Sequence, residues 1–147
     1  MDLKSTLQAD LKDALRRGEE TRKSTLRMAL TAIKLAEVEK SAHMDEAAYL
    51  AVMQKEIKAR REAIADAEKA NRPELIRQAE DEIKILQVYL PAALSQDELE
   101  GMAKAAIAEA GASSIREMGQ VMKILMPRLQ GRATGEQASQ AVRKLLQ

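Results

Sequence analysis

The pattern of apolar and polar residues over the first ninety positions predicts four amphipathic helices. Leucines recur every four residues near the N-terminus and Gly18 follows them, which predicts a helix over 2–17 and a stop. A second apolar stripe predicts a helix over 20–40, and Asp45 is the expected N-cap of a third helix that ends near residue 70. Pro73 suits the first position of a fourth helix, which should end before Pro91. The residues expected to face the core are Leu3, Leu7, Leu11 and Leu15, then Leu26, Ala29, Leu30, Ile33 and Ala36, then Leu50, Met53, Ile57 and Ile64, then Leu75 or Ile76, Ala79, Ile83 and Leu86.

After Pro91 the helix signals are mainly capping signals. Ser95 and Ser114 each have a glutamate three residues later, the spacing of a capping box, and Thr134 has Gln137 at the same spacing. Gly111 and Gly131 are the expected stops. These signals predict a compact three-helix domain over 91–147, joined by a short linker to a four-helix domain over 1–90.

Residues 119–135, GQVMKILMPRLQGRATG, contain an apolar stripe with an unusual composition. Met118, just before this segment, Met122 and Met126 are spaced by four residues, with Val121, Leu125 and Leu129 on the same side. Methionine fills irregular cores but also forms adaptable binding grooves. We expect core packing here, with Pro127 and Gly131 shaping the exit of the helix, because an exposed stripe of this length would promote aggregation.

Composition favours an all-α protein. The chain has 147 residues, 46% of them hydrophobic, but no Phe, no Trp and only two Tyr. A core of Leu, Ile, Val, Ala and Met suits helices better than sheets. The absence of cysteine excludes disulfides and thiolate metal sites, and a single histidine cannot form a zinc cage of the usual kind. We therefore expect no metal and no cofactor.

The N-terminal residues, MDLKSTLQADLKDALRR, include acids and lack the uninterrupted apolar segment of a signal peptide. Nowhere do about 18 apolar residues run together, the length a membrane-spanning helix requires. These features predict a cytoplasmic protein with no membrane partner.

Catalytic motifs are missing from the sequence. It contains no Walker loop, no G-x-S-x-G and no H-E-x-x-H. His43 is predicted to lie in a loop between two helices and to be solvated rather than a general base. Glu56 and Arg60, like Glu80 and Lys84, stand four apart, which is typical of solvated helix ion pairs. We expect no catalytic residue.

Charge provides the remaining candidate site. The net charge is only +1, but residues 112–147 contain six bases and two acids, and residues 12–34 contain seven bases and three acids. Structured RNA is bound largely through its phosphates and its shape, and this chain has few aromatic residues for base stacking. The alternative is that these are ordinary surface bases. The candidate RNA-binding residues are Lys123, Arg128, Arg132, Arg143 and Lys144, with Gly119 and Gly131 beside them.

Four segments in order carry a resemblance to a known family: RKSTLRMALTAIK at 22–34, KEIKARREAI at 55–64, NRPELIRQAEDEIKILQVYLPAALSQDEL at 71–99, and GQVMKILMPRLQGRATG at 119–135. The chain resembles the YqeY family, small bacterial proteins that share a domain with the C-terminal tail of the B subunit of the glutamine-dependent aspartyl/glutamyl-tRNA amidotransferase. The resemblance implies two helical domains, of four and three helices.

The resemblance also implies a function. In the amidotransferase the tail domain helps to hold the tRNA, while other domains perform amide transfer. A carbon–nitrogen ligase activity with glutamine as amide donor could be attached to this chain by association, yet its residues offer no means to perform it. The family's G-x-V-M-K segment falls on Gly119, Val121, Met122 and Lys123, and its G-R turn on Gly131 and Arg132. Thr134 stands where the family usually has Asp, which keeps the N-cap but removes a carboxylate.

Two functions follow as hypotheses. The first is a non-catalytic helical module that binds the tRNA backbone through the candidate cations. The second is an adaptor for a tRNA-handling protein, in which the basic N-terminal helix pair or a partly exposed methionine face docks the partner.

Overall fold

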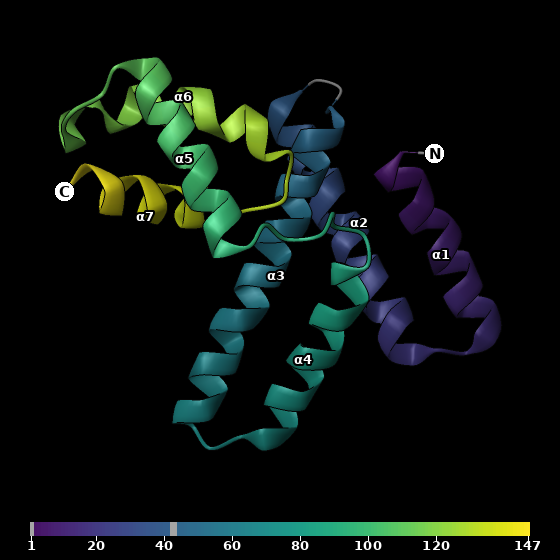
Figure 1. Ribbon diagram of the computed structural model, residues 1–147. Helices are drawn as coiled ribbons and strands as arrows, with labels where there is room; N and C mark the ends of the chain where they lie inside the picture. Colours follow the sequence, from purple (N-terminus) through teal and green to yellow (C-terminus); the bar gives the residue numbers. More distant parts are fainter. Residues whose placement is uncertain (1, 42–43) are drawn as a thin grey trace. The chain divides into compact units, whose positions relative to one another are not determined.

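The computed structural model describes residues 2–41 and 44–147 (Figure 1). The described residues form α-helices, one short 3-10 helix and connecting turns, without a strand, so the predicted all-α class is confirmed. Contacts divide the chain into two compact units, Met1–Leu90 and Pro91–Gln147. That each unit folds as a domain of its own stays a prediction. The helices are α1 (Leu3–Arg17), α2 (Glu20–Lys40), α3 (Glu46–Lys69), α4 (Pro73–Gln87), α5 (Gln96–Ala110), the 3-10 helix η1 (Ile115–Glu117), α6 (Met118–Leu129) and α7 (Gly135–Leu146).

Local signals in the first unit act as the sequence predicts. Gly18 ends α1 in the left-handed conformation at φ 69°, which its missing Cβ allows without strain. The Asp45 carboxylate caps α3 by accepting a hydrogen bond from the Ala48 N–H at 2.9 Å. Pro73 begins α4 at the first helical position. His43 lies outside the described residues.

Two helix hairpins build the first unit (Figure 1). α1 packs against α2, α3 runs antiparallel to α4, and α2 also contacts α3 and α4. Leu7, Leu26, Ile33, Met53 and Leu86 are fully buried at its centre. The Lys4 ammonium also joins α1 to α2, because it donates to the Glu37 carboxylate at 2.9 Å.

The leucine stripe of α1 is buried over only part of its length. Leu3 and Leu7 are buried, Leu11 is half-buried, and Leu15 is 46% exposed, so the prediction of Leu15 in the core is wrong. A step of four residues rotates a helical position by about 40°, and three such steps move Leu15 about 120° from Leu3. Ala14 lies close to the direction of Leu3 and is buried in its place.

Three helices surround the core of the second unit. Its fully buried side chains include Val121, Leu125 and Val142. Capping boxes form at Ser95 and at Thr134, as predicted. The box predicted at Ser114 is wrong: its side chain makes no capping bond, and Glu117 instead accepts from the N–H and the hydroxyl of Ser113. A single 3-10 turn, η1, takes the place of a capped α-helical start.

The methionine stripe of α6 lies at the edge of the core rather than inside it. Val121, Leu125 and Leu129 are buried, whereas Met118 and Met122 are half-buried and Met126 is 40% exposed. The same drift of about 40° per four residues carries the methionines away from the buried direction. α6 continues through Pro127 to Leu129, so the proline does not interrupt the helix. Gln130 and Gly131, which follow the helix, both have positive φ.

In the part of the chain that the structure describes, no helix is both long enough and apolar enough to span a membrane.

Candidate functional site

Lys123 extends from the solvent side of α6. Its position on the helix is about 160° from the centre of the buried Val121, Leu125 and Leu129 face, and its side chain is exposed. It forms no ion pair with any described residue. Lys123 is therefore a cation that an external anion can reach.

Acids on α5 pair with two of the other predicted cations. The Arg128 guanidinium lies 2.5 Å from the Glu109 carboxylate, and the Lys144 ammonium donates to Glu100 at 3.3 Å. The Gln96 amide and the Lys144 ammonium both lower the pKa of Glu100. Helix α5 packs against α6 and α7, so its four acids offset the basic block counted over 112–147. Over the whole of 91–147 there are seven bases against six acids.

Arg132 holds a structural position in the turn between α6 and α7. Its Nε donates to the Ala92 carbonyl at 2.9 Å, and its own carbonyl accepts from the Leu94 N–H at 2.9 Å. These two bonds attach the segment that leads into α5 to the α6–α7 turn. Arg132 therefore has a structural role in this turn, and its contact with RNA phosphate stays a prediction.

The other predicted site residues have distinct surroundings. Arg143 is exposed on α7 and forms no ion pair within the described part of the chain. Gly131 lies in the α6–α7 turn with φ 76°. Gly119 is exposed near the start of α6, and a Cβ added there would meet no atom within 4 Å. No close backbone approach thus requires glycine at 119.

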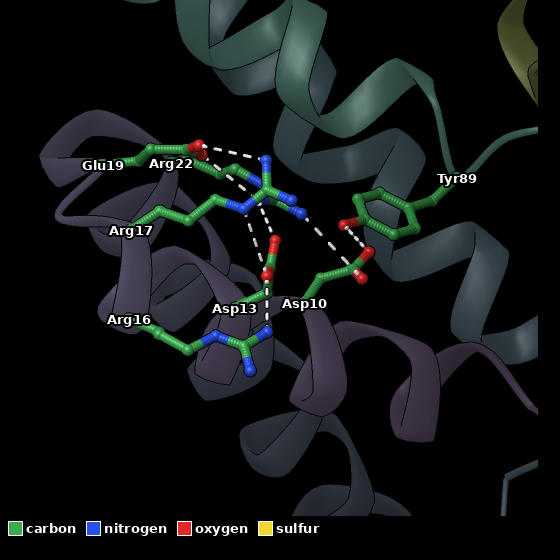
Figure 2. A network of polar contacts seen from close by, with 7 residues as sticks. All are labelled: Asp10, Asp13, Arg16, Arg17, Glu19, Arg22 and Tyr89. Carbon is green, nitrogen blue, oxygen red and sulfur yellow. Dashed lines mark hydrogen bonds and ion pairs between the residues drawn. The ribbon is translucent and has the colours of Figure 1, made fainter.

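A polar network in the first unit was not predicted from the sequence (Figure 2). The Arg22 guanidinium of α2 donates to Asp13 of α1 at 3.0 Å and to Glu19 at 3.1 Å. Tyr89, which follows α4, donates its hydroxyl to Asp10 of α1. Hydrogen bonds from Arg16 and Arg22 lower the pKa of Asp13 to about 2, and burial with the neighbouring Asp10 raises the pKa of Tyr89. The network joins three segments of the first unit.

The structure also corrects the prediction that Arg60 belongs to a solvated ion pair. The Arg60 side chain is not solvated, because the residue is only 7% exposed. It donates to the Glu56 carboxylate at 2.9 Å, and its Nε lies 3.6 Å from Glu82 of α4 and has no hydrogen-bond partner. The i, i+4 spacing of Glu56 and Arg60 gives the pair but not its burial, which depends on α4 packing over α3. Two carboxylates face this one arginine, so the group is a structural ion cluster rather than an anion site.

The described residues contain no group of three or more His, Cys, Asp or Glu arranged to hold a metal ion. Their polar clusters pair cations with acids and join helices to one another. The arrangement can therefore offer surface cations to a polyanion.

Known proteins similar to this chain include fungal ones. Proteins named "Altered inheritance of mitochondria protein 41, mitochondrial" are 35% identical over 85 residues in Vanderwaltozyma polyspora and 36% identical over 86 residues in Kluyveromyces lactis. These matches cover 57% and 58% of this chain, and 46% of each relative, so the chain matches just under half the length of these proteins. The family described as Yqey-like protein matches residues 4–146. The chain belongs to the YqeY-like family.

Proposed function

We propose that this chain is a non-catalytic helical module that binds tRNA, with Lys123 and Arg143 as the principal phosphate contacts. One observation carries the proposal: these two cations are exposed and form no ion pair with a described residue, whereas Arg128 and Lys144 are paired with acids. The resemblance to the tRNA-holding tail of the amidotransferase supports tRNA as the ligand. Phosphate contacts of this kind position a folded RNA without reading its sequence.

The test compares two double variants of the full chain that change the net charge equally. Lys123→Glu with Arg143→Glu reverses the two proposed contacts, and Arg61→Glu with Lys84→Glu reverses two exposed cations of the first unit. Binding to an unmodified tRNA transcript is measured by fluorescence anisotropy across a salt series. The first variant should bind more weakly, and the slope of log affinity against log salt should fall by about one per lost phosphate contact.

The control variant should keep the affinity and slope of the wild type, and both should keep its thermal unfolding midpoint. Equal affinity of the first variant and the wild type across the series would refute the proposed contacts. The non-catalytic part is tested separately: the purified chain with glutamine and aspartyl-tRNA should release no ammonia above a buffer control.

A second candidate is a protein-interaction adaptor, and exposed apolar residues on the outward face of α2 support it. Met28, Leu35 and Val38 on that face are 52%, 61% and 67% exposed. A pull-down with and without nuclease treatment separates the two functions. Partners lost on RNA digestion favour the RNA-binding module, and partners that persist favour the adaptor.

A further inference from the structure

Helix α2 has apolar residues on two opposite faces. Leu26, Ala29 and Ile33 point into the core of the first unit. Met28, Leu35 and Val38 lie on the outward side, about 150° around the helix from the buried set. A surface helix normally carries charged and polar residues on its solvent side, so a second apolar face indicates a surface that another element covers.

The spacing on the outward face is that of a coiled-coil seam. Met28, Thr31, Leu35 and Val38 follow one another at intervals of three, four and three residues, the a and d positions of a heptad. We call these four residues the α2 seam. Such a seam accepts side chains from one facing helix, because each a or d residue inserts between four residues of its partner.

Charges along the α2 seam identify the kind of partner. Arg27 and Lys34 lie one residue before Met28 and Leu35, at the g positions that face a partner's flank. Both are exposed and neither forms an ion pair with a residue that the structure describes. The opposite edge carries Ala32 and the acid Glu39. An antiparallel second copy would set the Arg27 and Lys34 edges of the two helices against each other, whereas an acidic flank would complement them.

The α2 seam contacts Arg60 of α3 at one end and continues into a groove at the other. Arg60, itself buried, donates from Nη2 to the Met28 sulfur at 3.7 Å, which fixes one end of the seam on the first unit. At the other end, Val38 and Lys34 also line an open groove of about 540 Å³ between α1 and α2, together with Lys4, Gln8, Leu30 and Glu37. The acid in that groove, Glu37, is held by the Lys4 ammonium at 2.9 Å.

We propose that the α2 seam docks an amphipathic helix of a partner protein, whose apolar heptad residues pack on Met28, Leu35 and Val38 and whose acidic flank pairs with Arg27 and Lys34. This interaction is independent of RNA binding by Lys123 and Arg143, which lie on other helices.

The experiment uses two designed helical peptides as probes of the full-length protein. Both have leucine at the a and d positions; one has glutamate and the other lysine at the e and g positions. Fluorescence anisotropy of the labelled peptides gives affinities. The acidic peptide should bind at least about tenfold more tightly than the basic one, because only its flank complements Arg27 and Lys34.

Two variants locate the binding surface. Leu35→Ser with Val38→Ser should weaken acidic-peptide binding by about tenfold or more, while a matched control, Leu75→Ser with Val88→Ser, should leave it unchanged. Arg27→Glu with Lys34→Glu should reverse the preference in favour of the basic peptide. All variants change exposed side chains, and circular dichroism is used to check that each stays folded.

Several results would overturn the proposal. One is equal binding, or no binding, of the acidic peptide compared with the basic one; another is unchanged binding by the seam variant. A wild-type dimer in sedimentation that Leu35→Ser with Val38→Ser converts to monomer would assign the seam to a second copy. Loss of tRNA binding on reversing Arg27 and Lys34, without acidic-peptide binding by the wild type, would assign it to RNA. None of the peptide results bears on the Lys123 and Arg143 proposal.

Discussion

Replacing Leu125 by alanine should remove much of the stability of the second unit while leaving the first intact. Leu125 is fully buried among α5, α6 and α7, and truncating such a leucine costs about 2–5 kcal/mol. A unit of 57 residues, Pro91–Gln147, has a total unfolding free energy of about 3–9 kcal/mol at typical values per residue. The substitution therefore removes about half of that free energy.

Hydrogen exchange followed by mass spectrometry separates the two units within one full-length sample. In Leu125→Ala, amides of α5, α6 and α7 should exchange faster by a factor that reflects the lost free energy, while those of α3 and α4 keep wild-type protection. Met126→Ala is the control, since that neighbouring side chain is 40% exposed and its loss should cost about 1 kcal/mol or less.

Equal loss of protection in α3 and α4 would refute the prediction that 91–147 is a domain of its own. Equal effects of Leu125→Ala and Met126→Ala would refute the assignment of the core face of α6. The two outcomes are distinguishable, because the first concerns which helices respond and the second concerns which residue matters.

Three further predictions concern local interactions. Thr134→Ala should destabilise the second unit by about 1 kcal/mol in urea unfolding, because it removes a formed capping box, whereas Ser114→Ala should have little effect since Ser114 makes no capping bond. The pKa of Asp13 falls from its ordinary 3.8 to about 2. The contribution of the Asp13 carboxylate to stability is therefore present above pH 4 and is lost as the pH falls towards 2. Asp13→Asn should remove that part of the acid dependence of the urea midpoint. Arg60→Met should cost about 3 kcal/mol in urea unfolding at neutral pH, since it leaves Glu56 and Glu82 without their shared cation; an unchanged midpoint would contradict this.

Helix positions could be predicted from the sequence because their signals are local. A glycine after α1, an aspartate before α3 and a proline at the start of α4 each act within one turn, and the observed bounds follow them. Burial was less predictable where a stripe had a period of four, because such a stripe drifts around the helix. Leu15 and Met126 both come at the end of such a stripe, and both are exposed.

Polar partners could not be predicted because they depend on which helices pack together. Asp10 and Tyr89 are 79 residues apart in sequence, and no local pattern relates them. The Glu56 and Arg60 spacing was visible, but only the packing of α4 over α3 buries the arginine beside Glu82. The heptad on the outward face of α2 was present in the sequence, yet its exposure becomes evident only once Leu26 and Ile33 are known to fill the core.

The predicted RNA-binding cations also differ in the intramolecular bonds that each of them makes. The Arg128 and Glu109 pair lies on the surface, where such pairs contribute about 0–1 kcal/mol, so Arg128 exchanges its partner at little cost. Arg132 donates from Nε to the Ala92 carbonyl, which helps to attach the segment before α5, so replacing Arg132 removes that bond. A charge reversal at Arg132 would therefore disturb the fold as well as any RNA contact, and its effect on affinity would not identify a binding residue. Lys123 and Arg143 make no such structural bond with a described residue, so reversing their charges tests the proposed RNA surface of the second unit without that ambiguity. Arg128 is the next residue to substitute.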